Sequence, residues 1–184
     1  MEYSIHGPFT IRTYKGVKNN KGVDQTKEAK KSFWNMVRNE VSGLPDSCGC
    51  YLFAIQAAKG IKPWYVGLAA KQSFEEECFK SQKINIYTTV LNKCGKGTPI
   101  LFLVAKLTKK GKFVNPNKKN GHKDIQYLET MLIGTAIEKN HELMNIMKTK
   151  YLREMCVPGL IHTPKRKLSQ PERKFKIAIK GKKK

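Results

Sequence analysis

The sequence has few arginines and few acidic residues for its size. Only five of its 36 Lys and Arg residues are Arg, and Asp and Glu together number 14. A guanidinium can read a base edge through two hydrogen bonds, whereas a lysine ammonium acts as a point charge beside phosphate. The shortage of arginine therefore favours contacts with a phosphate backbone over readout of individual bases.

The cysteines are odd in number and lack the spacing of a zinc site. They are Cys48, Cys50, Cys78, Cys94 and Cys156. No Cys-x-x-Cys pair occurs, and the single glycine between Cys48 and Cys50 is poor spacing for zinc. We expect five reduced thiols in a cytoplasmic protein.

Long apolar runs are also missing. None approaches the ~20 residues that a membrane-spanning helix needs. The opening residues Met1-Glu2-Tyr3-Ser4 do not have the pattern of a signal peptide. We therefore expect an intracellular protein without a membrane span.

What the chain does have is positive charge, with a formal net charge of +22. Such an excess opposes compaction by self-repulsion, and a polyanion that releases its counterions offsets it. Nucleic acid is the expected partner. An anionic membrane surface, or no dedicated polyanion at all, remain as alternatives.

The first part of the chain, residues 1–47, is predicted to be an N-terminal extension that packs on the core. Alternating apolar residues at positions 8–14 are compatible with a short strand. Thr26 is a suitable N-cap for a helix over 27–41, whose apolar residues recur at helical spacing.

Residues 48–157 are predicted to form the main domain, with three strands. An apolar segment at 50–56 and a second at 64–67 flank a Lys-Gly turn and predict a β-hairpin. The segment 99–107 is continuously apolar at its centre, which is typical of a strand covered on both faces.

Helices are expected around these strands. Ser73 can cap a short helix, 84–94 is interpreted as helical, one helix begins at Asp124 and another spans 141–155. The order of elements predicts an α+β fold with a small three-stranded antiparallel sheet flanked by helices.

Basic residues gather in two further segments. Residues 158–184 form a tail that is expected to be partly disordered, since its last 21 residues hold ten Lys or Arg residues against Glu172 alone. The loop 108–122 is rich in Lys, Asn and Gly. The nucleic-acid-binding candidates in the loop and tail are Lys109, Lys110, Lys112, Lys118, Lys119, Lys165, Arg166 and Lys167.

Two glycine-tyrosine clusters lie on the predicted hairpin, Gly49-Cys50-Tyr51 and Tyr65-Val66-Gly67. With Glu129 on a helix after the third strand, and Asn145 beyond it, the sequence resembles the GIY-YIG nuclease family over about residues 49–146. The resemblance implies the β-hairpin that the two apolar segments predict. It also implies phosphodiester hydrolysis on nucleic acid, with DNA preferred over RNA.

The same resemblance implies roles for single residues. Glu129 would hold one divalent ion, Mg²⁺ or Mn²⁺, and Asn145 would hold the site together by hydrogen bonds. Tyr51 and Tyr65 would position or activate the attacking water. Gly49 and Gly67 would allow close backbone approach.

One position departs from the family. The helix after the second cluster carries Glu77 in the register where the family has an arginine that stabilises phosphate charge. A carboxylate there repels substrate, so Lys71, Lys80 or Lys83 would have to replace the arginine. The alternatives are a degenerate domain that binds nucleic acid without cutting it, a basic subunit of a larger assembly, and a hairpin whose half-buried tyrosines have no catalytic role.

Overall fold

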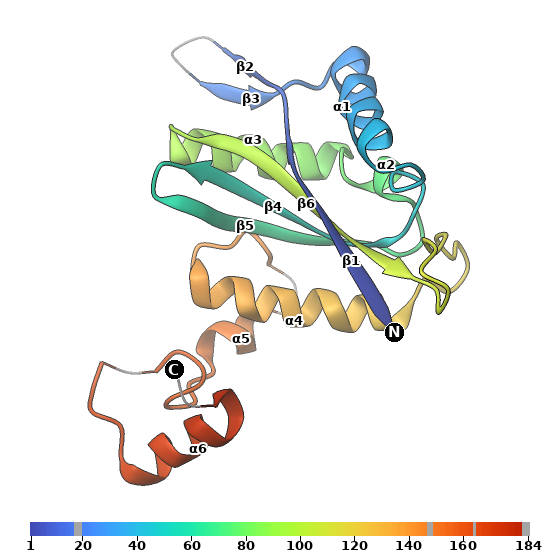
Figure 1. Ribbon diagram of the computed structural model, residues 1–184. Helices are drawn as coiled ribbons and strands as arrows, with labels where there is room; N and C mark the ends of the chain where they lie inside the picture. The colour runs from blue at the N-terminus through green and yellow to red at the C-terminus, as the bar shows by residue number, and fades with distance from the viewer. Residues whose placement is uncertain (17–19, 147–148, 164, 182–184) are drawn as a thin grey trace.

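The computed structural model describes residues 1–16, 20–146, 149–163 and 165–181, which form an α+β fold (Figure 1). Among these residues, no helix combines the length and apolar composition needed to cross a bilayer. All five cysteines are free thiols, as the sequence predicts.

The main sheet has four antiparallel strands in the order β1-β6-β4-β5. They are β1 (Glu2–Thr10), β4 (Gly49–Ala57), β5 (Gly60–Ala69) and β6 (Thr98–Leu107). The prediction of a three-stranded sheet is wrong, because β1 pairs along β6 from Glu2 opposite Leu107 to Thr10 opposite Ile100. Strand β6 is therefore internal, as its apolar run predicts. A separate two-stranded sheet joins β2 (Thr13–Lys15) to β3 (Lys21–Val23).

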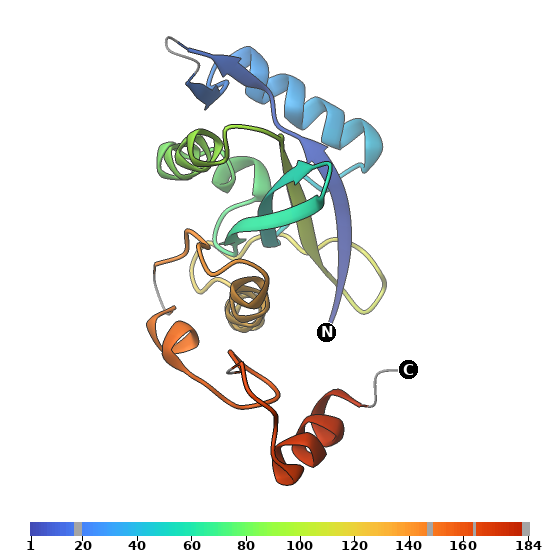
Figure 2. The same ribbon diagram turned by 90° about the vertical axis from the view of Figure 1, so that its left-hand side faces the viewer.

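Helices cover both faces of the main sheet (Figure 2). Those of the described chain are α1 (Lys27–Glu40), α2 (Phe74–Glu77), α3 (Ser81–Cys94), α4 (Lys123–Lys139), α5 (Lys150–Glu154) and α6 (Gln170–Lys180). Strand side chains alternate between the faces. In β4, Phe53 packs in the cluster that contains Phe33 of α1 and Tyr87 of α3, whereas Leu52 packs beside Ile133 of α4.

Two predicted helix starts are confirmed by their caps. The Thr26 hydroxyl accepts a hydrogen bond of 3.2 Å from the backbone N–H of Ala29. Ser73 and Glu76 form a reciprocal capping box at the start of α2. This short helix ends at Glu77 and leads the chain into α3, which runs antiparallel to the edge strand β5.

The helix predicted over 141–155 is wrong in its first half. Residues 140–146 instead follow the outer edge of β5, and only α5 is helical in that range among the described residues. The Asn140 amide donates to the carbonyl of Pro63, and the Met144 N–H donates to the carbonyl of Trp64. An edge strand presents unpaired backbone groups, and this segment satisfies them in place of another strand.

The described part of the tail is more ordered than the sequence predicts. Ser169 and Glu172 form a capping box that starts α6, a helix that lies apart from the main sheet (Figures 1 and 2). The prediction of disorder relied on the polar, lysine-rich composition of the tail. The pattern Ser-x-x-Glu at 169–172 is nevertheless a recognised helix start.

Candidate active site between helices α3 and α4

A cavity of about 370 Å³ lies where β5 ends, between the N-terminal parts of α3 and α4. We call it the Glu129 cavity. Its lining residues come from β5, the turn after it, α2, α3 and α4: Leu68, Ala70, Lys71, Gln72, Glu77, Lys80, Lys83, Gln126 and Glu129. Two segments, residues 68–83 and 126–129, thus bring two carboxylates and three lysines to one cavity.

Lys83 links the cavity to Tyr65. Its ammonium donates a hydrogen bond of 2.7 Å to the Tyr65 hydroxyl and lies 5.1 Å from the centroid of the ring. Burial lowers the pKa of Lys83, but the hydrogen bond to Tyr65 and the charges of Glu77 and Glu129 outweigh it, so the pKa is raised. Lys83 is therefore held as a cation beside the tyrosine.

Glu77 faces the same cavity and is neutralised there. Its carboxylate lies 2.7 Å from the Lys80 ammonium and 3.7 Å from that of Lys83. Lys80 also contacts Gln72, whereas Lys71 is exposed at the rim. The glutamate in the arginine register is thus bound by two of the lysines that were candidates to replace the arginine. Of those candidates, Lys83 makes the contact with Tyr65.

Tyr51 does not reach the cavity, contrary to the expectation that it stands at the site. It is fully buried, and its hydroxyl makes no well-formed hydrogen bond with the described residues. Burial raises the pKa of Tyr51 well above its ordinary value. Its ring lies over Gly67, where any side chain would overlap it. The pair packs within the hairpin, and neither residue lines the Glu129 cavity.

Gly49 provides a close approach between strands rather than towards a ligand. A Cβ at this position would collide with the carbonyl of Val104 on β6 and would lie 2.9 Å from the ring of Phe74. The glycine therefore lets β4, β6 and α2 pack together.

Asn145 is buried and binds the backbone of a single residue. Its side-chain oxygen accepts from the Val66 N–H at 2.9 Å, and its amide nitrogen donates to the Val66 carbonyl at 2.7 Å. Both partners lie inside the Tyr65-Val66-Gly67 cluster. Asn145 thus fixes the strand that carries Tyr65, and its role in an active site stays a prediction.

Glu129 lines the cavity with a half-buried side chain on α4. Within the described ranges, no group of three or more His, Cys, Asp or Glu side chains is arranged to hold a metal ion. The oxygen donors on the cavity are the carboxylates of Glu77 and Glu129 with the amides of Gln72 and Gln126. Hard oxygen donors of this kind suit Mg²⁺ or Mn²⁺, and Mg²⁺ takes few protein ligands and retains water.

The basic loop borders the cavity at one end. The Asn117 N–H donates to the carbonyl of Ala70, which holds the part of the loop with Lys118 and Lys119 beside the cavity wall. Lys109, Lys110 and Lys112 lie at the turn after β6 instead, and all five are exposed.

In the tail, Lys165, Arg166 and Lys167 are exposed beside α6. The Arg166 guanidinium makes two hydrogen bonds to Glu172, at 2.9 and 2.6 Å. Arg166 is thus engaged by the first turn of α6.

Two polar clusters were not predicted. On one, Asp124 accepts hydrogen bonds from Tyr3 at 2.7 Å and Lys106 at 2.9 Å. On the other, Glu142 bridges Lys62 and Lys93. The charge pattern alone could not reveal either cluster, because its members lie on elements that meet only in the folded chain.

No family model, curated protein or solved structure matches this chain.

Proposed function

We propose that the protein is a metal-dependent endonuclease of GIY-YIG type, with the Glu129 cavity as its active site and DNA as its preferred substrate. The observation that carries the proposal is the convergence of Glu129 with Lys83, which is bonded to Tyr65, on one cavity. A nucleophilic attack on a phosphodiester needs a metal ligand, a cation and a polar group near the phosphate, and these residues supply all three types.

Each residue has its own part in this proposal. Glu129 would hold the divalent ion, with Gln126 on the same helix face one turn before it. An ion held there would supply charge stabilisation at the scissile phosphate. The Tyr65 hydroxyl accepts from Lys83 and keeps its own O–H, so it can donate to a phosphate oxygen or to the attacking water.

The lysines supply the charge that the missing arginine would provide. Lys83 is fixed by Tyr65 and Glu77, and Lys71 at the rim is exposed to an approaching phosphate. A lysine serves as a single point charge and lacks the paired donors of a guanidinium. The site is therefore expected to be slower than one built around arginine.

Conversion of supercoiled plasmid to nicked circles in Mg²⁺ or Mn²⁺ tests the proposal. We expect nicking with either ion and none in EDTA. Nicking that persists undiminished in EDTA, or its absence with both ions, contradicts the assignment.

A second function is favoured by the ion pairs of Glu77. Because this carboxylate engages both Lys80 and Lys83, the cavity carries less positive potential than three lysines suggest. A domain with this arrangement is suited to hold nucleic acid without cutting it. It would bind DNA with a steep dependence on salt and leave plasmid intact under every metal.

A further inference from the structure

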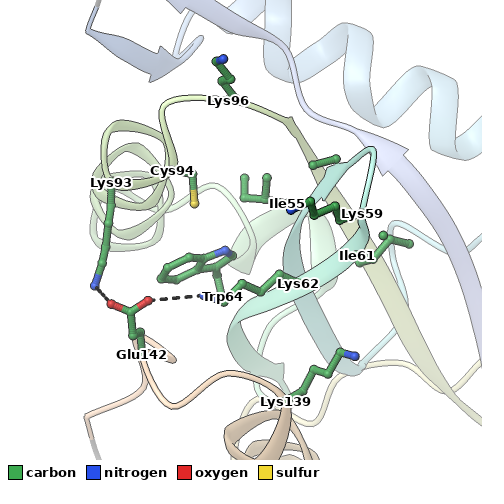
Figure 3. Close-up of a pocket in the computed structure, with 12 residues that line it drawn as sticks. Ile55, Lys59, Ile61, Lys62, Trp64, Lys93, Cys94, Lys96, Lys139 and Glu142 are labelled. Carbon is green, nitrogen blue, oxygen red and sulfur yellow. Dashed lines mark hydrogen bonds and ion pairs between the residues drawn. The ribbon is translucent and has the colours of Figure 1, made fainter.

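A second, larger pocket lies at the opposite end of β5. Its volume is about 600 Å³, and five lysines but only one acidic residue line it. The charged lining residues are Lys59, Lys62, Lys93, Lys96, Lys139 and Glu142. Figure 3 shows Lys62, Lys93 and Glu142 beside the indole of Trp64, so we call this the Trp64 pocket. The hairpin turn and the C-terminal ends of α3 and α4 form its walls.

A β-bulge brings Trp64 to this place. Pairing along the hairpin jumps from Tyr65 opposite Phe53 to Pro63 opposite Ala54, so Trp64 is the extra residue. Because a bulge interrupts the alternation of strand side chains, Trp64 and Tyr65 both pack on the α3 side of the sheet. As a result, Tyr65 contacts Lys83 near the start of α3, and Trp64 contacts Lys93 near its end.

Trp64 has an unused hydrogen-bond donor. The side chain is only 2% exposed, and its indole N–H has no partner among the described residues. Two ammoniums lie near the ring, that of Lys62 at 4.5 Å and that of Lys93 at 5.6 Å from its centroid. Buried donors are normally satisfied, so this unpaired N–H is unusual, but it is closed off from solvent; the attraction for an anion comes from the two ammoniums over the ring.

Glu142 occupies part of the pocket as an internal anion. Its two carboxylate oxygens lie 2.5 Å from the Lys93 ammonium and 3.3 Å from the Lys62 ammonium. Hydrogen bonds from Lys93 and Lys62 lower the pKa of Glu142. All three side chains are about half exposed, at 46, 47 and 50%. Exposed ion pairs of this kind are weak, so a phosphate can displace the carboxylate.

The two pockets are spaced along the same two helices. On α3, Lys83 lines the Glu129 cavity and Lys93 lines the Trp64 pocket. On α4, Glu129 and Lys139 are separated by the same ten residues, which corresponds to about 15 Å along each helix. A nucleic-acid strand advances by about 3.4 Å per nucleotide, so the spacing matches four to five nucleotides, roughly.

We propose that the Trp64 pocket binds the phosphodiester backbone of nucleic acid, about four to five nucleotides from the Glu129 cavity. Lys62 and Lys93 exchange Glu142 for a phosphate, and Lys59, Lys96 and Lys139 add positive charge to the lining of the pocket. The spacing rests on the proposed function, whereas binding at the pocket does not require cleavage.

The test is the affinity for a 5′-labelled duplex of about 30 base pairs, measured by fluorescence anisotropy in EDTA across a salt series, so that no cutting occurs. The variant is Lys62→Ala with Lys93→Ala. The control has the same change of charge, Lys27→Ala with Lys31→Ala on the exposed side of α1. We expect the pocket variant to bind at least fivefold more weakly than the control and to lose about two units of salt slope, roughly one per phosphate contact.

Two further variants distinguish an effect of the pocket on binding from an effect of misfolding and from an effect of net charge. Lys62→Arg with Lys93→Arg keeps the cations and should keep wild-type affinity. Glu142→Gln removes the internal anion and should bind more tightly than Glu28→Gln, which makes the same change on α1. Thermal melting shows whether each variant is folded.

The outcomes distinguish this proposal from the function proposed above. If the pocket variant binds as well as the Lys27 and Lys31 control, and Glu142→Gln matches Glu28→Gln, the Trp64 pocket has only a structural role and the inference is overturned. If the pocket variant is selectively weakened while wild-type protein never nicks plasmid, the pocket stands and the nuclease assignment fails.

Discussion

The Lys83 ammonium lies 2.7 Å from the hydroxyl of Tyr65 and donates a hydrogen bond to it. This contact joins α3 to β5 at the wall of the Glu129 cavity. It places a fixed cation next to the tyrosine of the second glycine-tyrosine cluster. The same lysine also lies beside Glu77, so its position is determined from two sides.

Lys83→Ala should lower the rate of plasmid nicking by about 10²-fold, because removal of one group that stabilises transition-state charge has effects of this size. Lys83→Arg should retain most of the rate, since it preserves the cation. Lys80→Ala is the matched control on the same wall, where the side chain is 45% exposed. A larger loss for Lys80→Ala than for Lys83→Ala would assign the essential cation to Lys80 instead.

Glu77→Gln should tighten DNA binding, because it releases Lys80 and Lys83 from a carboxylate that neutralises them. We expect a several-fold gain in affinity at low salt that disappears as salt screens the charges. Glu28→Gln on α1 changes the net charge equally and serves as the control. Equal gains for both variants would mean that Glu77 acts only through net charge.

Asn145→Ala should destabilise the fold by about 2–3 kcal/mol, because it removes two hydrogen bonds and leaves both backbone groups of Val66 without their partners. Urea denaturation measures the change. Asn92→Ala, which also removes side-chain bonds but at an exposed position, should cost clearly less. A similar cost for both would show that the Val66 groups find other partners.

The Asp124 carboxylate should stabilise the fold at neutral pH and lose this effect in acid. Burial raises its pKa, but the hydrogen bonds from Lys106 and Tyr3 outweigh that effect, so the pKa of Asp124 is lowered. A carboxyl whose pKa is lower in the folded state contributes stability above the unfolded pKa of about 3.9, and loses it as the pH falls through the folded value.

Asp124→Asn should therefore be less stable than wild type at pH 7, by about 1–2 kcal/mol. The difference should shrink as the pH falls below about 4, where the unfolded chain begins to take up the proton. Urea titrations at pH 7 and at a pH below about 4 measure both free energies of unfolding, with the exposed Asp46→Asn as the reference. A difference that stays constant with pH would assign the effect to packing.

Local signals in the sequence predicted the hairpin, the third strand and most helices of the main domain. Thr26 and Ser73 marked helix starts because capping needs only neighbouring residues. The pairing of β1 with β6 was missed, since it joins residues about 100 positions apart. The segment 141–146 was misassigned as helix because Asn140 and Asn145 gain more from bonding to the edge of β5 than from a helical turn.

The candidate site was predicted in part. The resemblance named Glu129, which lines the cavity, Tyr65, which bonds to the cavity residue Lys83, and Asn145, which holds the neighbouring Val66. It also named Tyr51, which does not line the cavity because its ring is buried over Gly67. The choice of Lys83 among the lysines, and the whole Trp64 pocket, depend on side chains that meet only in three dimensions.

Metal-dependent plasmid nicking by wild type, Glu129→Gln and Glu138→Gln tests the central claim most directly. Glu138 lies on the same helix, is exposed, and does not line the Glu129 cavity, so its variant controls for the loss of one carboxylate. We predict that wild type and Glu138→Gln nick plasmid in Mg²⁺, while Glu129→Gln loses at least 10²-fold in rate, roughly the effect of losing an essential charged group. Equal nicking by all three proteins would contradict the assignment of the active site to this cavity.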